Sequence, residues 1–311
     1  MPHRALPEVD YADVDISADL LGDRYAAPIL ISSMTGGTPE GERLNRRLGQ
    51  FAEEKRIPMG VGSQRVALEN RSGGYFRELR QDAPGAALFA NIGAVQLNYG
   101  VTADDCAWLV ESISARALIL HCNPLQEAIQ HEGNRNFSGL LAKIEGLKKI
   151  LSVPLVLKET GCGIDRKTAR RALDAGVDAI DVAGRGGTHW GYIEGLRSEE
   201  RRKLGEYFKD WGNESAQATR DCVQAVGDAI PVIASGGIRS GLDVAKALSL
   251  GASFCGMALP FLKAVHSGVE VLEENWRIHT EALRVALFCM GVPSIPALAE
   301  MERRDEEEIR Y

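Results

Sequence analysis

Two glycine-rich turns near the end of the chain have the composition of a phosphate-binding site. Gly236 and Gly237 follow the apolar run PVIA, and Ser240 after them is typical of a residue that begins a helix. Glycines let a backbone approach a ligand closely, and the N–H groups at a helix start attract an anion. A further turn, at Gly256, follows the next apolar run. A tight turn would explain one Gly-Gly pair alone, but this combination favours binding of a phosphate group.

Lys158 and Asn91 each come at the end of an apolar run, where a polar side chain needs a partner. A buried ammonium is costly unless it meets Glu159, another carboxylate or an anionic ligand. Lys158 would therefore form an ion pair that closes the rim of the fold or meet an anionic ligand. If that ligand were a flavin, the lysine would stabilise the negative charge of the reduced ring. Asn91 would bind the edge of a heterocycle or hold a neighbouring loop, and the residues alone leave both interpretations open.

A third group of polar residues lies in the stretch HCNPLQEAIQ. It begins with His121 and Asn123 at the end of an apolar run. Gln126 and Glu127 follow Pro124, inside an expected helix whose dipole favours a carboxylate in the first turn. A carboxylate beside an amide could hold Mg²⁺ on a diphosphate, if the substrate supplies the other oxygens. A glutamate in a first turn is otherwise only a favourable charge.

The apolar runs that precede these groups must position them. Continuous apolar runs of this length are typical of strands buried on both faces of a parallel sheet. They span residues 28–33, 58–62, 86–91, 117–123, 154–159, 178–183, 231–236 and 253–258. Helical spacing of apolar residues lies between them, as after the helix start Thr38-Pro39. Eight β–α units of roughly thirty residues predict an α/β fold, a (β/α)8 TIM barrel with its site at the carboxyl ends of the strands.

One alternative architecture is a doubly wound open sheet, but no G-x-G-x-x-G opens the first helix. We therefore expect a single domain over residues 1–311, with an insertion at about 190–213 between strand six and strand seven. The insertion mixes charged side chains with aromatic ones, which predicts a lid, an oligomer contact or a solvated charged helix. Its aromatic residues are Trp190, Tyr192, Tyr207, Phe208 and Trp211.

The composition excludes several classes of protein. A net charge of −7 argues against a nucleic-acid-binding surface, although local basic pockets for phosphates remain open. The apolar runs are too short to span a membrane, and the acidic, proline-containing start is not a signal peptide. Six scattered cysteines without a C-x-x-C pair argue against a zinc site or a disulfide framework. We expect a soluble, cytoplasmic protein.

The motifs SSMTGG, GVGSQR, HCNPLQEAIQ, LKETGCG, DVAGRGGTHW and ASGGIRSGLDVAKALSLGA, in this order, resemble those of type 2 isopentenyl-diphosphate delta-isomerases. The resemblance runs from Ala5 to Leu298. NPLQE is its most specific part, whereas SGGIR is shared with other FMN-binding barrels. It implies that isopentenyl and dimethylallyl diphosphate are interconverted by a 1,3-allylic proton shift. Reduced FMN would act as acid and base, with Mg²⁺ on the diphosphate, NADPH as the flavin reductant and a homo-oligomer, tetramer or octamer, as the assembly.

The same resemblance implies roles for individual residues. His121 and Gln126 would be catalytic, and Glu127 would bind the metal. The substrate would contact Ser63, Gln64, Arg65, His121, Asn123 and Gln126. FMN would contact Ser33, Met34, Thr35, Ser63, Asn91, Lys158, Thr188, Gly236, Gly237, Ile238, Arg239, Ala258 and Leu259.

Two positions depart from the family pattern. The family carries a basic R-K-x-x-H segment before its ALPE stretch, and this segment clamps the diphosphate, whereas here only MPHR precedes Ala5. We therefore expect the chain to retain FMN but to bind isopentenyl diphosphate weakly. His189 stands where the family commonly has a small residue, and it would narrow the pocket or pack against Trp190.

Three other functions compete with the isomerase. An FMN-dependent 2-hydroxyacid oxidase should carry a His-x-x-Arg pair after strand six, where this chain reads RGGTHW. An inosine-monophosphate dehydrogenase needs a nucleophilic cysteine, for which Cys162 is a poor candidate beside Lys158. A flavin-binding relative without turnover is the remaining alternative. Conversion of isopentenyl diphosphate by the reduced protein would distinguish these functions.

Overall fold

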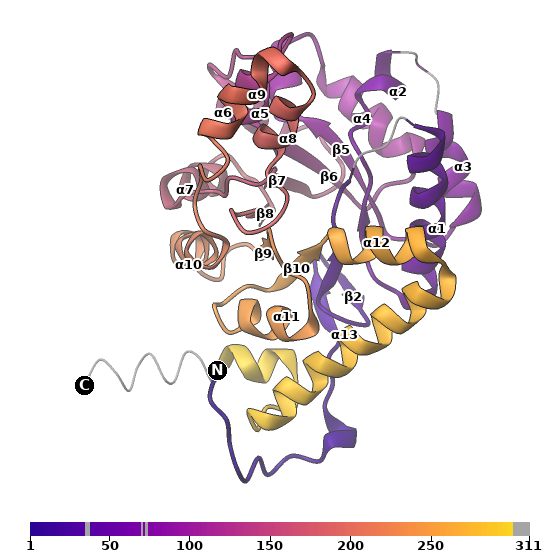
Figure 1. Cartoon of the computed structure of the whole chain (residues 1–311), viewed down its shortest axis with the longest axis vertical. Helices are drawn as coiled ribbons and strands as arrows, with labels where there is room; N and C mark the ends of the chain where they lie inside the picture. The colour runs from indigo at the N-terminus through magenta and orange to yellow at the C-terminus, as the bar shows by residue number, and fades with distance from the viewer. Residues whose placement is uncertain (35–37, 70, 72–73, 301–311) are drawn as a thin grey trace.

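Parallel strands form the centre of the molecule (Figure 1). The computed structural model describes residues 1–34, 38–69, 71 and 74–300. In these residues, eight parallel strands close a barrel in the order β10-β3-β4-β5-β6-β7-β8-β9. Each strand overlaps one of the predicted apolar runs, so the predicted TIM barrel is confirmed. The strands are β3 (Ile29–Ile31), β4 (Met59–Gly60), β5 (Leu88–Gly93), β6 (Ala117–Cys122), β7 (Leu155–Glu159), β8 (Ala179–Asp181), β9 (Val232–Ser235) and β10 (Phe254–Met257).

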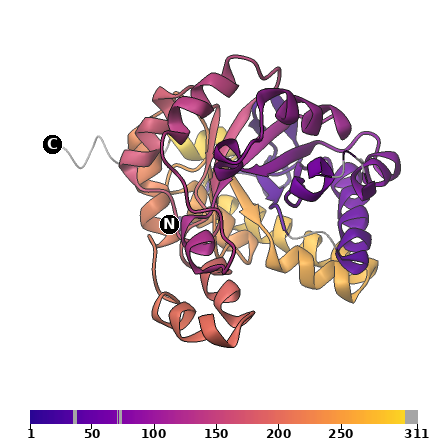
Figure 2. The same cartoon turned by 90° about the horizontal axis from the view of Figure 1, so that it is seen from above.

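Helices lie around the outside of these strands (Figure 2). Thr38 caps α1 by accepting a hydrogen bond from the Gly41 N–H, and Ser240 caps α11 by accepting one from the Asp243 N–H. Both predicted helix starts are therefore confirmed. The helices outside the predicted insertion at about 190–213 are α1 (Pro39–Lys55), α2 (Arg65–Glu69), α3 (Gly74–Asp82), α4 (Ala103–Ser112), α5 (Pro124–Ile129), α6 (Leu140–Lys148), α7 (Arg166–Asp174), α10 (Ser215–Val226), α11 (Gly241–Leu248), α12 (Leu259–Ser267) and α13 (Val269–Cys289), with the short 3-10 helices η1 (Tyr11–Asp13) and η2 (Ala94–Asn98). Among the described residues, none of the helices combines the length and hydropathy needed to cross a membrane.

An antiparallel hairpin that the sequence did not predict precedes the barrel. Its strands are β1 (Ala18–Leu20) and β2 (Asp23–Tyr25). Leu20 and Tyr25 pack into a cluster of buried residues from the barrel strands, where the Tyr25 ring meets Phe254 edge-on with centroids 5.8 Å apart. The hairpin thus buries apolar area against the interior of the barrel.

The long connection between β8 and β9 contains α8 (Trp190–Leu196) and α9 (Glu199–Tyr207). Helix α8 packs against both α9 and α5, and Figure 1 shows these three helices together at one end of the molecule. Since α5 follows directly after β6, this contact holds the insertion beside the carboxyl ends of the barrel strands.

The loops after β8 and β9 touch through their backbones. Gly236 has φ +93° and Gly237 has φ +88°, a region that favours glycine. A Cβ atom on Gly236 would overlap the Gly184 carbonyl oxygen, and one on Gly237 would lie 2.5 Å from the Gly186 carbonyl oxygen. The contact between the two loops therefore requires glycine at both positions, whether or not a ligand binds. The sequence did not reveal this requirement.

We expect Gly236→Ala to lower the free energy of unfolding by on the order of 1–3 kcal/mol, because it adds a clash to an unfavourable backbone conformation. Gly100→Ala is the matched control, since Gly100 has φ +96° but nothing within 4 Å of its Cβ position. The Gly100→Ala control should lower the free energy of unfolding by about 1 kcal/mol. Urea denaturation of both variants measures the difference. Equal losses would show that the contact between the two loops imposes no constraint.

Candidate active site

A pocket of about 530 Å³ lies at the carboxyl ends of the barrel strands, and every barrel strand or the loop after it contributes to its wall. Of the residues assigned from the sequence, the pocket is lined by Ser33, Met34, Ser63, Arg65, Asn91, His121, Asn123, Gln126, Glu127, Lys158, Thr188, Gly236, Gly237, Ile238, Arg239, Ala258 and Leu259. Thr35 falls outside the described residues. The remaining residue, Gln64, lies elsewhere.

Gln64 is fully buried and does not line the pocket, contrary to its expected contact with substrate. Its side-chain oxygen accepts a hydrogen bond from the Asn91 N–H at 3.0 Å, and its amide nitrogen donates to the Leu109 carbonyl oxygen at 3.4 Å. Both ends of the amide thus bond to the protein's own backbone. Gln64 joins the end of β4 to β5 and α4.

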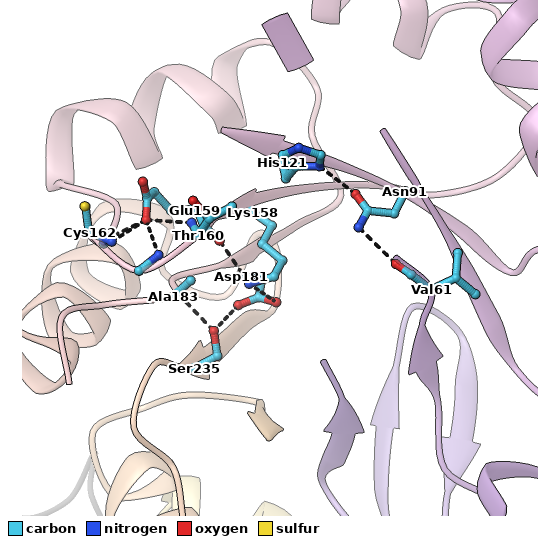
Figure 3. Close-up of polar contacts among 12 residues, drawn as sticks. Val61, Asn91, His121, Lys158, Glu159, Thr160, Cys162, Asp181, Ala183 and Ser235 are labelled. Atoms are coloured by element: carbon cyan, nitrogen blue, oxygen red, sulfur yellow. Dashed lines mark hydrogen bonds and ion pairs between the residues drawn. The ribbon is translucent and has the colours of Figure 1, made fainter. Parts of the chain in front are cut away.

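Asn91 orients His121 (Figure 3). The Asn91 amide nitrogen donates to the Val61 carbonyl oxygen at 3.0 Å, which leaves its oxygen 2.8 Å from His121 Nδ1. Because that oxygen can only accept, Nδ1 of His121 carries the proton and Nε2 keeps its lone pair. Asn91 therefore holds a neighbouring loop, one of its two expected roles, and it also lines the pocket.

The electrostatic surroundings keep His121 neutral. Burial, followed by the positive charges of Lys158 and Arg65, lowers the pKa of His121 to about 4. A neutral imidazole whose N–H bonds to Asn91 offers the pocket only a hydrogen-bond acceptor. At neutral pH His121 is therefore a poor proton donor.

Lys158 meets a carboxylate from the adjacent strand β8. Its ammonium lies 3.4 Å from Asp181 Oδ2 and donates to the Glu159 carbonyl oxygen at 2.9 Å. The Glu159 side chain turns away and accepts hydrogen bonds from the N–H groups of residues 160–163. Burial raises the pKa of Glu159, and these amide donors oppose that rise. The sequence left Lys158 with several possible partners and did not predict Asp181, whose signal was a carboxylate within the apolar run DAIDVA.

A second polar group lies where α5 and α8 meet. Glu127 is buried and accepts from the Asn123 amide at 3.0 Å and from the Asn134 N–H. The Gln126 amide donates to the Glu194 carboxylate at 3.4 Å, and Glu194 pairs with Arg197 at 3.1 Å. The insertion thus adds a carboxylate and a cation to the pocket wall. Neither residue was predicted from the sequence, although the mixture of charged and aromatic residues at 190–213 was their signal.

His189 was expected either to narrow the pocket or to pack against Trp190, and it does not line the pocket. Its Nδ1 accepts from the Tyr192 N–H at 3.1 Å, which caps α8. Its Nε2 donates to the Trp211 carbonyl oxygen at 2.9 Å. One imidazole therefore joins the start of the insertion to its end, and neither bond could be inferred from the position of His189 in its motif.

The donors in the pocket fit FMN. Ser32 and Ser33 have buried hydroxyl oxygens that no described residue bonds, which leaves them available to a ligand. Lys158 offers a positive charge in the same pocket, and Gly237, Ile238 and Arg239, which line it, come directly before the start of α11, a position that favours an anion. The pocket thus combines sites for a polar ring and for a phosphate.

The described residues contain no cluster of three or more His, Cys, Asp or Glu side chains that could hold a metal ion. Glu127 fits Mg²⁺ only as one ligand, so a bound diphosphate and water would have to supply the other oxygens.

Comparison with known proteins identifies the family. A family model described as FMN-dependent dehydrogenase matches residues 98–304. The isopentenyl-diphosphate delta-isomerase of Nostoc sp. is 47% identical over 95% of this chain and 85% of its own length. The corresponding protein of Pseudescherichia vulneris is 46% identical over 97% of this chain and 88% of its own length. The chain belongs to the isopentenyl-diphosphate delta-isomerase family.

Membership of the isomerase family confirms the resemblance that the motifs indicated, and the FMN-dependent dehydrogenase match supports the flavin. Solved structures agree on the fold. A mandelate oxidase structure has a TM-score of 0.66 at 21% identity, covering 96% of this chain and 84% of its own. At this identity the likeness shows the fold alone, so it does not favour an oxidase over the isomerase family.

The pKa of His121 predicts a loss of stability in acid. Because this pKa is about 4 in the folded protein and 6.5 in the unfolded chain, the unfolded state binds more protons between these values. We expect the free energy of unfolding to fall as the pH decreases from 6.5 to 4, and His121→Gln to reduce that fall. Urea denaturation of the FMN-free protein across this pH range measures the free energy of unfolding. The exposed His131 provides the control His131→Gln, and identical pH profiles for wild type and His121→Gln would contradict the prediction.

Proposed function

We propose that this chain is an FMN-dependent isopentenyl-diphosphate isomerase that converts isopentenyl diphosphate to dimethylallyl diphosphate and back by a 1,3-allylic proton shift. The observation that carries the proposal is one pocket with two polar sides. One side has Lys158, two unpaired serine hydroxyls and a helix start, which suit FMN. The other has Arg65, Gln126 and Glu127, which suit a diphosphate with its metal. The names of the full-length relatives support the same substrate.

On the flavin side, residues of the chain would bind the cofactor and stabilise its negative charge. Ser33, Met34 and Ser63 would contact the ring, and Gly237, Ile238 and Arg239 would hold the phosphate at the start of α11. Lys158 would stabilise negative charge on the reduced ring. Reduced FMN would supply the groups that donate one proton to the substrate and remove another.

On the substrate side, the chain would supply orientation and charge. Arg65, with its side chain 48% exposed, and Arg197, with 70%, are cations at the pocket that can reach a diphosphate without a large loss of hydration. Glu127 would hold Mg²⁺ against the diphosphate oxygens. Neutral His121 would accept a hydrogen bond, and Gln126, held by Glu194, would orient the alkene or relay a proton.

The reductant, the cellular compartment, the domain organisation and the assembly are proposed as well. NADPH would reduce the flavin, and the protein would work in the cytoplasm. The chain would act as one domain whose insertion forms part of the site. It would assemble as a tetramer or octamer, and exposed apolar side chains on α13, such as Ile278 at 49% and Val285 at 43%, are suitable for a subunit contact.

The direct test is turnover by the reduced protein. FMN-loaded protein, reduced without oxygen and supplied with Mg²⁺ and isopentenyl diphosphate in D₂O, should form dimethylallyl diphosphate that carries deuterium, which NMR detects. The same protein with oxidised FMN should form much less. Protein that binds FMN but neither converts the substrate nor exchanges its protons would overturn the isomerase and leave a flavin-binding protein without this activity.

We also expect Glu127→Gln to lower kcat/KM by roughly 10- to 100-fold at limiting Mg²⁺, because the lost charge weakens the contact with the metal. High Mg²⁺ should recover part of the loss, and FMN affinity should stay unchanged because Glu127 lies on the substrate side. Steady-state kinetics across Mg²⁺ concentrations measures the effect, with Glu132→Gln on the exposed surface as the control. An unchanged Mg²⁺ dependence would mean that the metal is held elsewhere or by the substrate alone.

A further inference from the structure

A buried ion pair joins Lys158, which lines the pocket, to Asp181 (Figure 3). Lys158 on β7 and Asp181 on β8 are paired in the register of the barrel, and their side chains are 8% and 1% exposed. Lys158 lines the pocket, whereas Asp181 does not. A ligand in the pocket would therefore meet the ammonium, with the carboxylate behind it.

Asp181 is held in one orientation from the adjacent strand β9. Its Oδ1 accepts a hydrogen bond from the Ser235 hydroxyl, and that hydroxyl oxygen accepts from the Ala183 N–H at 3.0 Å. Its Oδ2 has no hydrogen-bond donor among the described residues and lies 3.4 Å from the Lys158 ammonium. The free carboxylate oxygen is thus directed to the lysine.

The other charged and titratable groups near Lys158 do not replace Asp181. On β6, His121 is neutral because its pKa is lowered by burial and by the charge of Lys158 itself. On β7, the Glu159 carboxylate is bonded to the amides of residues 160–163. Arg65, whose charge also acts on His121, would repel the ammonium. Among the described residues, Asp181 alone forms an ion pair with Lys158.

We propose that Asp181 is a positioning residue that keeps Lys158 charged beneath the flavin and thereby raises the reduction potential of bound FMN. The inference rests on the proposed function only in that the pocket binds FMN. A ring over Lys158 would remove water from the ammonium, and an ammonium buried without a counter-charge gives up its proton. The resulting neutral amine would no longer stabilise the negative charge of the reduced ring.

The sign of the change in reduction potential tests the inference, because a second effect of Asp181 would change the potential in the opposite direction. If Asp181 only neutralised Lys158, its removal would raise the potential at every pH. The arrangement favours our sign, because the ammonium lines the pocket and the carboxylate lies behind it, so a ligand interacts more strongly with the lysine. Removing the carboxylate should therefore act mainly through the charge of Lys158.

The experiment compares the midpoint potentials of FMN bound to wild type, Asp181→Asn, Lys158→Met and the double variant between pH 6 and 9. At pH 8 we expect Asp181→Asn to weaken binding of reduced FMN relative to oxidised FMN about tenfold, which lowers the potential by about 30 mV for a two-electron couple. The deficit of Lys158→Met should be at least as large throughout this pH range. The double variant should match Lys158→Met.

A potential in Asp181→Asn that equals or exceeds that of the wild type at pH 8 would overturn the inference. Ser235→Ala is the second variant. It removes the bond that orients Asp181, together with the acceptor of the Ala183 N–H, but leaves the carboxylate in place, so it should lower the potential less, in the same direction. Asp174→Asn, at an exposed ion pair with Arg170 on α7, is the control and should leave the potential unchanged. Absorbance titration with FMN separates the two proposals. A wild type that binds no FMN would refute the proposed function. Normal FMN binding, with the same potential in Asp181→Asn as in wild type, would refute only the role of Asp181.

Discussion

Closure of the parallel barrel is the constraint on which the rest of the structure depends. Pairing of β10 with β3 completes the ring, so all eight carboxyl ends in the described structure meet at one rim. The barrel strands begin with apolar residues, and their charged side chains, such as Lys158, Glu159 and Asp181, lie at their carboxyl ends. Polar groups gathered there must satisfy one another, which is why Asn91 meets His121 and Lys158 meets Asp181 across adjacent strands.

These pairs also divide the pocket electrostatically. The charge of Lys158, together with burial, keeps His121 uncharged, and Asp181 balances Lys158 from behind. The proposed flavin side therefore has a fixed cation with a counter-ion, while the proposed substrate side combines the amides of Asn123 and Gln126 with the buried carboxylate of Glu127. The proposed proton shift suits such a site, because its side chains would need to orient the reactants and stabilise charge rather than accept electrons.

The insertion completes one side of the pocket from outside the barrel. Helix α8 packs on α5, and its Glu194 and Arg197 join Gln126 at the pocket. His189 fastens the two ends of the insertion by capping α8 and bonding to the Trp211 carbonyl oxygen. The position of the pocket wall thus depends on a contact outside the pocket.

The sequence by itself determined the barrel, the helix starts at Thr38 and Ser240, and the family, because apolar runs, caps and motifs are local patterns. It missed the hairpin β1–β2, whose three-residue strands are too short to form such a run. Only the tertiary structure decided that Gln64 turns inward, that Asp181 pairs with Lys158 and that His189 bonds to Trp211. The last two contacts join residues more than twenty positions apart, and the direction of the Gln64 side chain depends on β5 and α4 beside it, so no local pattern encodes them.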